Sequence, residues 1–163
     1  MTGDATFTAQ VRPAGSSDVD GIWRVHNESI RVLCRGNYKA REIAAWIAFR
    51  PPEAYRAALA TRSLFVAERE DEIVGFGQFD PVRGEVEACY VSPEAIGRGI
   101  GSDLLARMED QARESGHAVI RLNATLNAEA FYVGRGYRRL GPATHRVGDD
   151  VLLACIRMEK KLP

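Results

Sequence analysis

The sequence has no excess of charge of either sign. Its 163 residues include 22 Lys plus Arg and 22 Asp plus Glu, so the formal net charge is zero. A chain with this balance lacks the bulk electrostatic field that attracts nucleic acid or an anionic membrane. It also lacks any apolar stretch near the ~20 residues of a membrane span, and residues 1–15 hold no long apolar run typical of a signal peptide. We therefore expect a cytoplasmic protein that binds neither nucleic acid nor membrane.

Cysteine is scarce as well. The three cysteines are Cys34, Cys89 and Cys155, and no two stand at CxxC spacing. This disfavours a disulfide framework and a cysteine-based zinc site, and it fits a reducing compartment. We expect no metal requirement. Repeats, low-complexity tracts and linkers are also missing, so residues 1–163 are expected to form one domain.

The hydrophobic pattern predicts an α/β fold. Helical spacing of apolar residues, with flanking glycine and proline, predicts helices over residues 19–33, 39–49, 53–60, 100–115 and 127–135. Strands are expected over residues 6–12, 63–68, 73–79, 85–91, 119–123, 137–140 and 151–160. Short connections between residues 63 and 91 favour an antiparallel meander. The layout predicts one central sheet, mixed and mostly antiparallel, flanked by helices.

A glycine-rich loop joins the strand ending at Val91 to the helix that follows, with glycines at positions 97, 99 and 101. Glycine permits close backbone approach and positive φ. The first amides of a helix lack intrahelical partners and favour an anion, so the loop is a candidate phosphate cradle to which Arg98 could add a charge. The order of residues excludes a Walker A loop and fits the dinucleotide fingerprint poorly, because Ser102 stands where that motif has glycine. By spacing alone, anion binding and a ligand-free tight connection both remain open.

Two motifs resemble the GNAT superfamily of N-acetyltransferases. Residues 96–101, Ile-Gly-Arg-Gly-Ile-Gly, resemble its Gln/Arg-x-x-Gly-x-Gly/Ala loop, with Ile96 in place of Gln or Arg. Residues 127–132, Asn-Ala-Glu-Ala-Phe-Tyr, followed by Gly136-Tyr137, are similar to its second signature. The resemblance implies a GNAT-like single domain that uses acetyl-coenzyme A. It places the pyrophosphate and pantetheine of coenzyme A along Cys89, Tyr90, Val91, Gly97, Arg98, Gly99, Ile100, Gly101, Ser102 and Asn127.

The resemblance also implies catalytic residues. Tyr132 would protonate the departing thiolate as a general acid, with a purely structural aromatic anchor as the alternative. Glu85 and Glu87 lie two apart on one expected strand face, and either could serve as the base, with Glu87 nearer the expected thioester. A bulge could change which one points inward, and a solvated strand edge is the alternative for both. An amide near Val91 is the expected donor to the thioester carbonyl.

The acceptor side is less defined. The pattern His-x-x-Ser-Ile-Arg with a downstream Tyr and Trp is similar to a branch of uncharacterised bacterial GNAT proteins, which makes His26, Ser29, Tyr38 and Trp46 candidate substrate contacts. Burial in the core is the alternative for His26 and Trp46. Arg31 and Arg35 could bind an acidic substrate, or simply form a solvated face.

The expected reaction is direct acetyl transfer to a primary amine of a small molecule or amino-acid derivative. A coenzyme A-binding regulatory module without turnover and a protein or peptide N-acetyltransferase are the alternatives. A homodimer is possible, with the apolar run of residues 151–156 either at its contact or in an interior strand.

Overall fold

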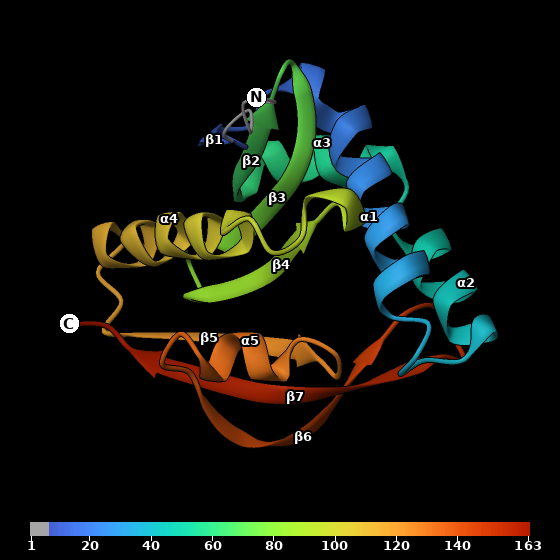
Figure 1. Cartoon of the computed structure of the whole chain (residues 1–163). Helices are drawn as coiled ribbons and strands as arrows, with labels where there is room; N and C mark the ends of the chain where they lie inside the picture. The colour runs from blue at the N-terminus through green and yellow to red at the C-terminus, as the bar shows by residue number, and fades with distance from the viewer. Residues whose placement is uncertain (1–6) are drawn as a thin grey trace, which may run out of the picture.

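One seven-stranded sheet runs through the part of the chain that the structure, a computed structural model, describes, residues 7–163 (Figure 1). Its strand order is β1-β2-β3-β4-β5-β7-β6, and every neighbouring pair is antiparallel except β4 and β5. The strands are β1 (Gln10–Pro13), β2 (Ser63–Arg69), β3 (Glu72–Asp80), β4 (Glu85–Val91), β5 (Val119–Thr125), β6 (Arg138–Arg146) and β7 (Leu152–Lys161). The predicted fold class is therefore confirmed.

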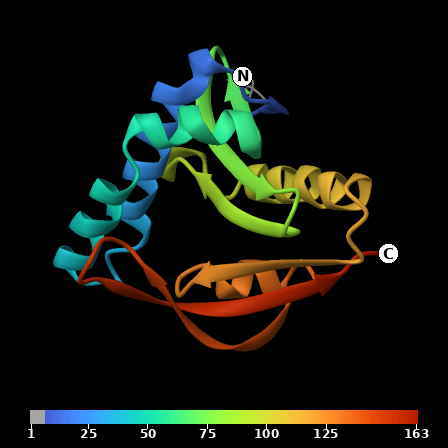
Figure 2. The same cartoon turned by 180° about the vertical axis from the view of Figure 1, so that it is seen from behind.

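Helices cover both faces of this sheet. The helices are α1 (Val19–Leu33), α2 (Ala40–Phe49), α3 (Pro52–Thr61), α4 (Ile100–Glu114) and α5 (Glu129–Val133), with short 3-10 turns at Ser16–Asp18 and Pro93–Ala95. Figure 2 shows α1, α2 and α3 together on one side of the strands, while α4 lies on the other side. Helix α5 packs with α4 in the same hydrophobic core.

Alternation along β2 builds the two cores. Phe65 and Ala67 face the core shared with α4, whereas Leu64 and Val66 face the core shared with α1 and α3. Successive strand residues point to opposite faces, so a strand buried on both faces is apolar throughout. Glycine brings α4 close to β3, because a Cβ at Gly77 would lie 2.8 Å from the Met108 methyl carbon. A larger residue there would require the end of the Met108 side chain to shift.

Three elements differ most from the sequence-based prediction. Strand β6 extends to Arg146, although the expected strand ended at residue 140. It is an edge strand with mostly exposed side chains, so hydrogen bonding to β7 forms it without an apolar pattern. Helix α5 is shorter than the expected range 127–135. The first strand begins at Gln10, and Thr6 of its expected range lies outside the described residues.

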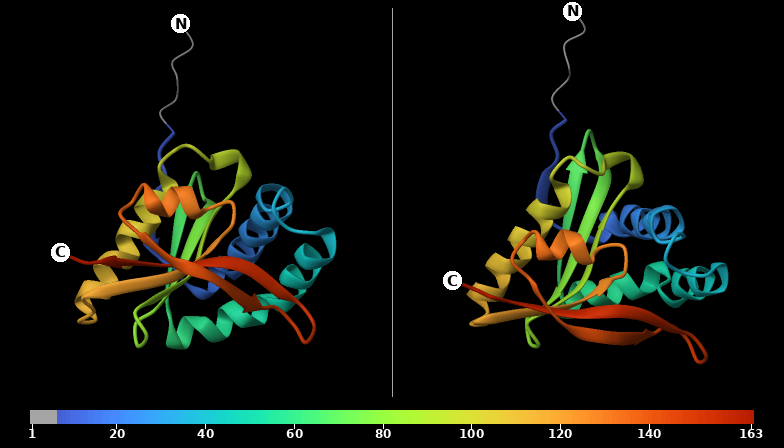
Figure 3. Two further views of the ribbon diagram at one scale, coloured as in Figure 1. Left: turned by 90° about the horizontal axis from the view of Figure 1, so that it is seen from below. Right: turned by 60° about the horizontal axis from the view of Figure 1, so that its bottom comes forward.

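The sheet opens between its two parallel strands. Strands β4 and β5 pair only at Glu85 with Arg121 and at Val86 with Leu122, and beyond these positions they diverge (Figure 1). The register with β3 shifts between Gln78 and Phe79, which leaves Glu87 as an extra residue in β4. A bulge of this kind bends a strand and increases its twist. Figure 3 shows β7 and β6 crossing below the opening, with α5 beside it.

Candidate active site

A cleft of about 470 Å³ occupies the opening between β4 and the loop that enters α4. We call it the glycine-loop cleft. It includes nine of the ten residues predicted to bind the cofactor: Cys89, Tyr90, Val91, Gly97, Gly99, Ile100, Gly101, Ser102 and Asn127. The N-terminal turn of α4 and the C-terminal end of α1 both line this cleft, through Ile100 and Leu33 respectively.

The glycine loop presents the start of α4 to this cleft. Gly99 is the N-cap residue with φ of 81°, a left-handed conformation that a residue with a side chain rarely adopts. A Cβ at Gly99 or at Gly97 would meet no protein atom within 4 Å, so the backbone there borders open space. The unpaired amides of the first turn and the dipole of this 15-residue helix favour a negatively charged group. The loop therefore has the local geometry of an anion cradle.

The cation beside the cradle is Arg135, which sequence analysis missed. Arg135 donates from Nε to Ser102 Oγ at 2.6 Å and also from Nη2, and its guanidinium lies 4.6 Å from the Phe131 ring centroid. The Arg98 side chain instead lies over the Phe7 ring, 4.9 Å from its centroid, and does not line the cleft. The sequence favoured Arg98 because it lies within the loop, whereas Arg135 reaches the site from beyond α5.

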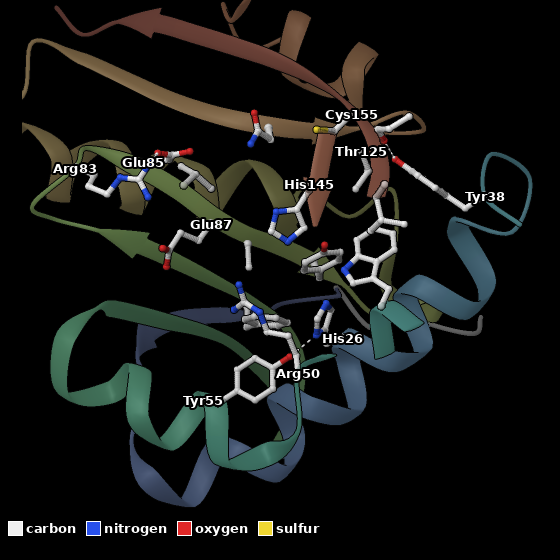
Figure 4. A pocket seen from close by; sticks show the side chains of 18 residues that line it. His26, Tyr38, Arg50, Tyr55, Arg83, Glu85, Glu87, Thr125, His145 and Cys155 are labelled. Atoms are coloured by element: carbon white, nitrogen blue, oxygen red, sulfur yellow. Dashed lines mark hydrogen bonds and ion pairs between the residues drawn. The ribbon is translucent and has the colours of Figure 1, made fainter. Parts of the chain in front are cut away.

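A second cavity, of about 300 Å³, lies between β4, β5, β7 and helices α1 to α3 (Figure 4). We call it the aromatic pocket because seven ring side chains line it: His26, Tyr38, Trp46, Tyr55, Phe76, Tyr90 and His145. Its charged lining residues are Arg50, Arg83, Glu85 and Glu87. A small cavity that combines aromatic rings with convergent charged and polar side chains is a candidate binding site for a small polar molecule.

Three of the four predicted acceptor contacts line the aromatic pocket, and each also has a structural partner. Tyr38 donates to the Ala154 carbonyl at 2.6 Å and accepts from the Leu126 amide, and its ring contacts Trp46. His26 is buried, and its Nδ1 shares a hydrogen bond with the Tyr55 hydroxyl. Burial lowers the pKa of His26 to about 3, so the ring is neutral at physiological pH.

Ser29 is not brought to the aromatic pocket. It faces the glycine-loop cleft, where its Oγ donates to the Val91 carbonyl at 2.7 Å. The Ser92 amide donates to Val74 of β3 at 2.8 Å, and successive strand residues turn their amides to opposite sides. The Val91 amide therefore faces the cleft, where β5 no longer pairs with β4.

The two cavities meet at Tyr90 and Thr125, which line both of them. A narrow space between β4 and β5 adjoins this junction and is lined by Glu87, Cys89 and Tyr132, among others. The structure thus brings together the predicted acid, the favoured base and the β4 backbone between two cavities.

The two candidate carboxylates differ in how many of their oxygens are already paired. Glu85 Oε1 lies 2.6 Å from Arg157 and its Oε2 lies 3.1 Å from Arg83, so both oxygens have an arginine partner.

Glu87 accepts from Arg62 at 2.9 Å and from Gln78 at 2.6 Å, both through Oε2. Its Oε1 has no hydrogen-bond partner among the described residues. Of these two carboxylates, Glu87 alone has an oxygen without a partner among the described residues, which makes it the better placed proton acceptor.

The remaining titratable groups at the junction are uncharged. Burial raises the pKa of Tyr132 well above its ordinary value, so its hydroxyl keeps the proton that a general acid must donate. Burial also raises the pKa of Cys34 to about 11 and of Cys89 to about 12. Neither thiol is a thiolate at neutral pH, the form in which cysteine acts as a nucleophile.

Comparison with known proteins settles the family. A family model described as an acetyltransferase (GNAT) domain matches residues 34–162. The chain belongs to the GNAT acetyltransferase family. The resemblance drawn from the two sequence motifs is confirmed, as is the predicted enzyme class, an N-acetyltransferase.

Individual relatives of this acetyltransferase are distant. The L-methionine sulfoximine/L-methionine sulfone acetyltransferase of Pseudomonas aeruginosa is 27% identical over 147 residues, which cover 83% of this chain and 80% of that protein. A GCN5-related N-acetyltransferase from Rhodopseudomonas palustris superposes with a TM-score of 0.88 at 26% identity, covering 97% and 98% of the two chains. The PaiA N-acetyltransferase from Thermoplasma acidophilum, solved with coenzyme A, has a TM-score of 0.79 at 20% identity, covering 95% and 99%. The last likeness shows the shared fold alone.

Other features of the acetyltransferase bear on the remaining predictions. No helix within residues 7–163 has the length and apolar character to cross a membrane. In the same residues, no cluster of three or more His, Cys, Asp or Glu side chains is arranged to hold a metal ion, and the lack of a metal requirement stays a prediction. The apolar run at residues 151–156 falls mainly in β7, which pairs with β5 and β6 on its two edges. Within that run Cys155 and Ile156 pair on both edges, whereas residues 152–154 pair with β6 alone, and the homodimer stays a prediction.

Proposed function

We propose that the enzyme transfers the acetyl group of acetyl-coenzyme A directly to the primary amine of a small molecule or amino-acid derivative. The observation that supports this most is the junction of the two cavities at Tyr90 and Thr125. One cavity has an anion cradle suited to a pyrophosphate, and the other is a small aromatic pocket suited to an acceptor. A thioester and an amine that enter from the two sides would meet beside Glu87 and Tyr132.

Residues of the glycine-loop cleft fit coenzyme A by their chemistry. The free amides at the start of α4 suit the pyrophosphate, and Arg135 adds a positive charge at the same end. Ile96 stands where the family usually has Gln or Arg, so Arg135 can supply the side-chain contact that Ile96 cannot. The Cys89 backbone and the Val91 amide, which face the side of β4 that β5 leaves unpaired, are available to coenzyme A.

The proposed chemistry assigns one role to each group at the junction. An amine attacks a thioester only when neutral, and Glu87 Oε1 takes its proton directly or through water. The Val91 amide donates to the thioester oxygen as negative charge develops there. Tyr132, held protonated by burial, gives a proton to the departing sulfur, and it regains a proton, directly or through water, when the nitrogen loses its second proton as the amide forms. The protonated thiols of Cys34 and Cys89 favour direct transfer over an acetyl-cysteine intermediate.

A small acceptor fits the size of the aromatic pocket, and the relative from Pseudomonas aeruginosa acts on amino-acid derivatives by its name. A thiol-release assay with acetyl-coenzyme A across amines, amino acids and peptides tests the proposal. Turnover of small amines supports it, and preferential turnover of peptides would point to a protein N-acetyltransferase. Tight binding of acetyl-coenzyme A without turnover of any acceptor would favour the regulatory module.

A further inference from the structure

Arg50 is the charged side chain of the aromatic pocket that lacks a counter-ion. Figure 4 shows it extending into the pocket from the corner between α2 and α3, beside Tyr55 and His26. No carboxylate of the described residues lies within ion-pair distance of its guanidinium, and no hydrogen bond to that guanidinium is present. The side chain is half-buried, so this positive charge is only partly hydrated.

The backbone around Arg50 holds this position. Arg50 ends α2 with φ of −123° and ψ of 77°, because a residue before proline is excluded from the helical region. Pro51 then adopts an extended conformation and Pro52 begins α3. The ring of Phe49 contacts His145 of β6, with centroids 6.3 Å apart, which ties the corner to the far wall of the pocket. Arg50 therefore lies on a backbone segment whose conformation is restricted by the two prolines, and its side chain faces the cavity.

The other charges of the pocket are neutralised within the protein. Glu85 pairs with Arg83 and Arg157, and Glu87 pairs with Arg62. Burial, reinforced by the positive charge of Arg50, lowers the pKa of both His26 and His145, which keeps these rings uncharged at neutral pH. One unpaired positive charge thus remains, on a wall built mainly of aromatic rings.

We infer that the acceptor is an amine that also carries an anionic group, and that Arg50 binds this group as a specificity-determining residue. This inference rests on the proposed function, because it names the chemical class of the acceptor at the same site. A carboxylate or phosphonate matches the planar, multidentate donor set of a guanidinium. The anionic end would lie at the α2–α3 corner, and the amine would point to Glu87 and the junction. A dication would meet an uncompensated positive charge, so polyamines and aminoglycosides are poor acceptors.

The test uses matched pairs of amines that differ only in the anionic group. Suitable pairs are L-phenylalanine with phenethylamine, L-methionine sulfone with its decarboxylated amine, and 3-aminopropylphosphonate with propylamine. Each is assayed for kcat and KM with the wild-type enzyme, Arg50→Gln, Arg50→Lys and the control Arg41→Gln, which changes an exposed arginine of α2 outside the pocket. Calorimetric titration of each amine into the coenzyme A-loaded enzyme provides a readout that does not need turnover.

We expect the anionic member of at least one pair to have a kcat/KM about 10- to 100-fold above its neutral partner, the range of one charge-assisted interaction. In Arg50→Gln this preference collapses through a higher KM, while the affinity for acetyl-coenzyme A is unchanged. Arg50→Lys recovers part of the preference, and Arg41→Gln behaves as wild type. The phosphonate and carboxylate pairs report which anion fits the corner.

Two results would overturn the inference: neutral amines used as well as their anionic partners by the wild type, or a preference that survives in Arg50→Gln. If no amine is acetylated although acetyl-coenzyme A binds, the proposed function fails, and calorimetry still decides on Arg50. Binding of an anionic amine that is lost in Arg50→Gln supports the anionic site. No binding of any amine in the panel counts against it.

Discussion

Replacement of Glu87 by Gln tests the proposed base while keeping the shape of the side chain. Glutamine can still accept from Arg62 through its amide oxygen, but it cannot take a proton from the attacking amine. Arg62 retains a second carboxylate, because its Nη2 lies 3.6 Å from Asp80 Oδ2. The variant therefore removes a proton acceptor without leaving an isolated cation.

The magnitudes separate a catalytic effect from a structural one. The Glu87 and Arg62 side chains are 19% and 31% exposed, so the lost charge-assisted bond is expected to cost about 1 kcal/mol after allowance for solvent screening. For a chain of this size that lowers Tm by roughly 2–4 °C. Loss of a general base lowers turnover by about 10²- to 10⁴-fold. A protein that is fully folded at the assay temperature should therefore lose most of its activity.

Glu85→Gln is the matched control. Both oxygens of Glu85 are paired with arginines, so we expect turnover to fall by less than about 5-fold, well below the loss of a general base. Rates are measured under single-turnover conditions across pH with acetyl-coenzyme A saturating. Turnover by Glu87→Gln should depend less on pH than that of the wild type, and Glu85→Gln should keep the wild-type profile. A larger loss in Glu85→Gln, or full activity in Glu87→Gln, would refute the assignment.

Three further predictions follow from the same structure. Gly99→Val should weaken acetyl-coenzyme A binding by at least about 10-fold, since valine disfavours a φ of 81° and projects a side chain into the cradle; calorimetric affinity within a factor of two of wild type would place the cofactor elsewhere. Tyr132→Phe should lower the single-turnover rate constant by about 10²-fold with unchanged acetyl-coenzyme A affinity. An unchanged rate constant when chemistry limits the rate would show that Tyr132 is not the general acid. The His26 ring should remain neutral in NMR titration from pH 8 to pH 5, because burial lowers its folded pKa to about 3, and a midpoint above pH 5 would contradict its burial. The unfolded chain binds this proton near pH 6.5, so His26 lowers stability as pH falls from there toward 3.

Much of the fold could be predicted because local signals agree with tertiary packing. Helix α1 spans residues 19–33 as its apolar periodicity indicates, and β4 spans residues 85–91 as predicted. The antiparallel meander of β2, β3 and β4 was predicted from its short connections, whereas the pairing of the later strands was not accessible in the same way. The divergence of β4 from β5 depends on contacts between segments more than 30 residues apart, and no pattern within either strand encodes it.

In the candidate site too, residues within a local motif were predicted, whereas residues contributed by distant segments were not. The glycine loop was found because a strand, three glycines and a helix follow one another in sequence. Arg135 and Arg50 were missed because each reaches its cavity from a separate element, and neither belongs to a motif. The sequence did hold a signal for Arg50, because the two prolines that follow it fix the end of α2 and so place Arg50 at the corner between α2 and α3. Arg31 and Arg35, the basic residues singled out on the sequence, instead line a groove between α1 and α2 outside the aromatic pocket.

The most direct test of the account is to identify the product. The enzyme is incubated with acetyl-coenzyme A labelled with ¹³C in the acetyl group and with the best acceptor of the amine panel, and the products are analysed by NMR and mass spectrometry. We predict an N-acetyl amide of the small amine, formed in one-to-one ratio with free coenzyme A and without acetylated enzyme on the pathway. Release of coenzyme A with labelled acetate alone, or label retained on a cysteine that is then passed to the amine, would contradict direct transfer to a small amine.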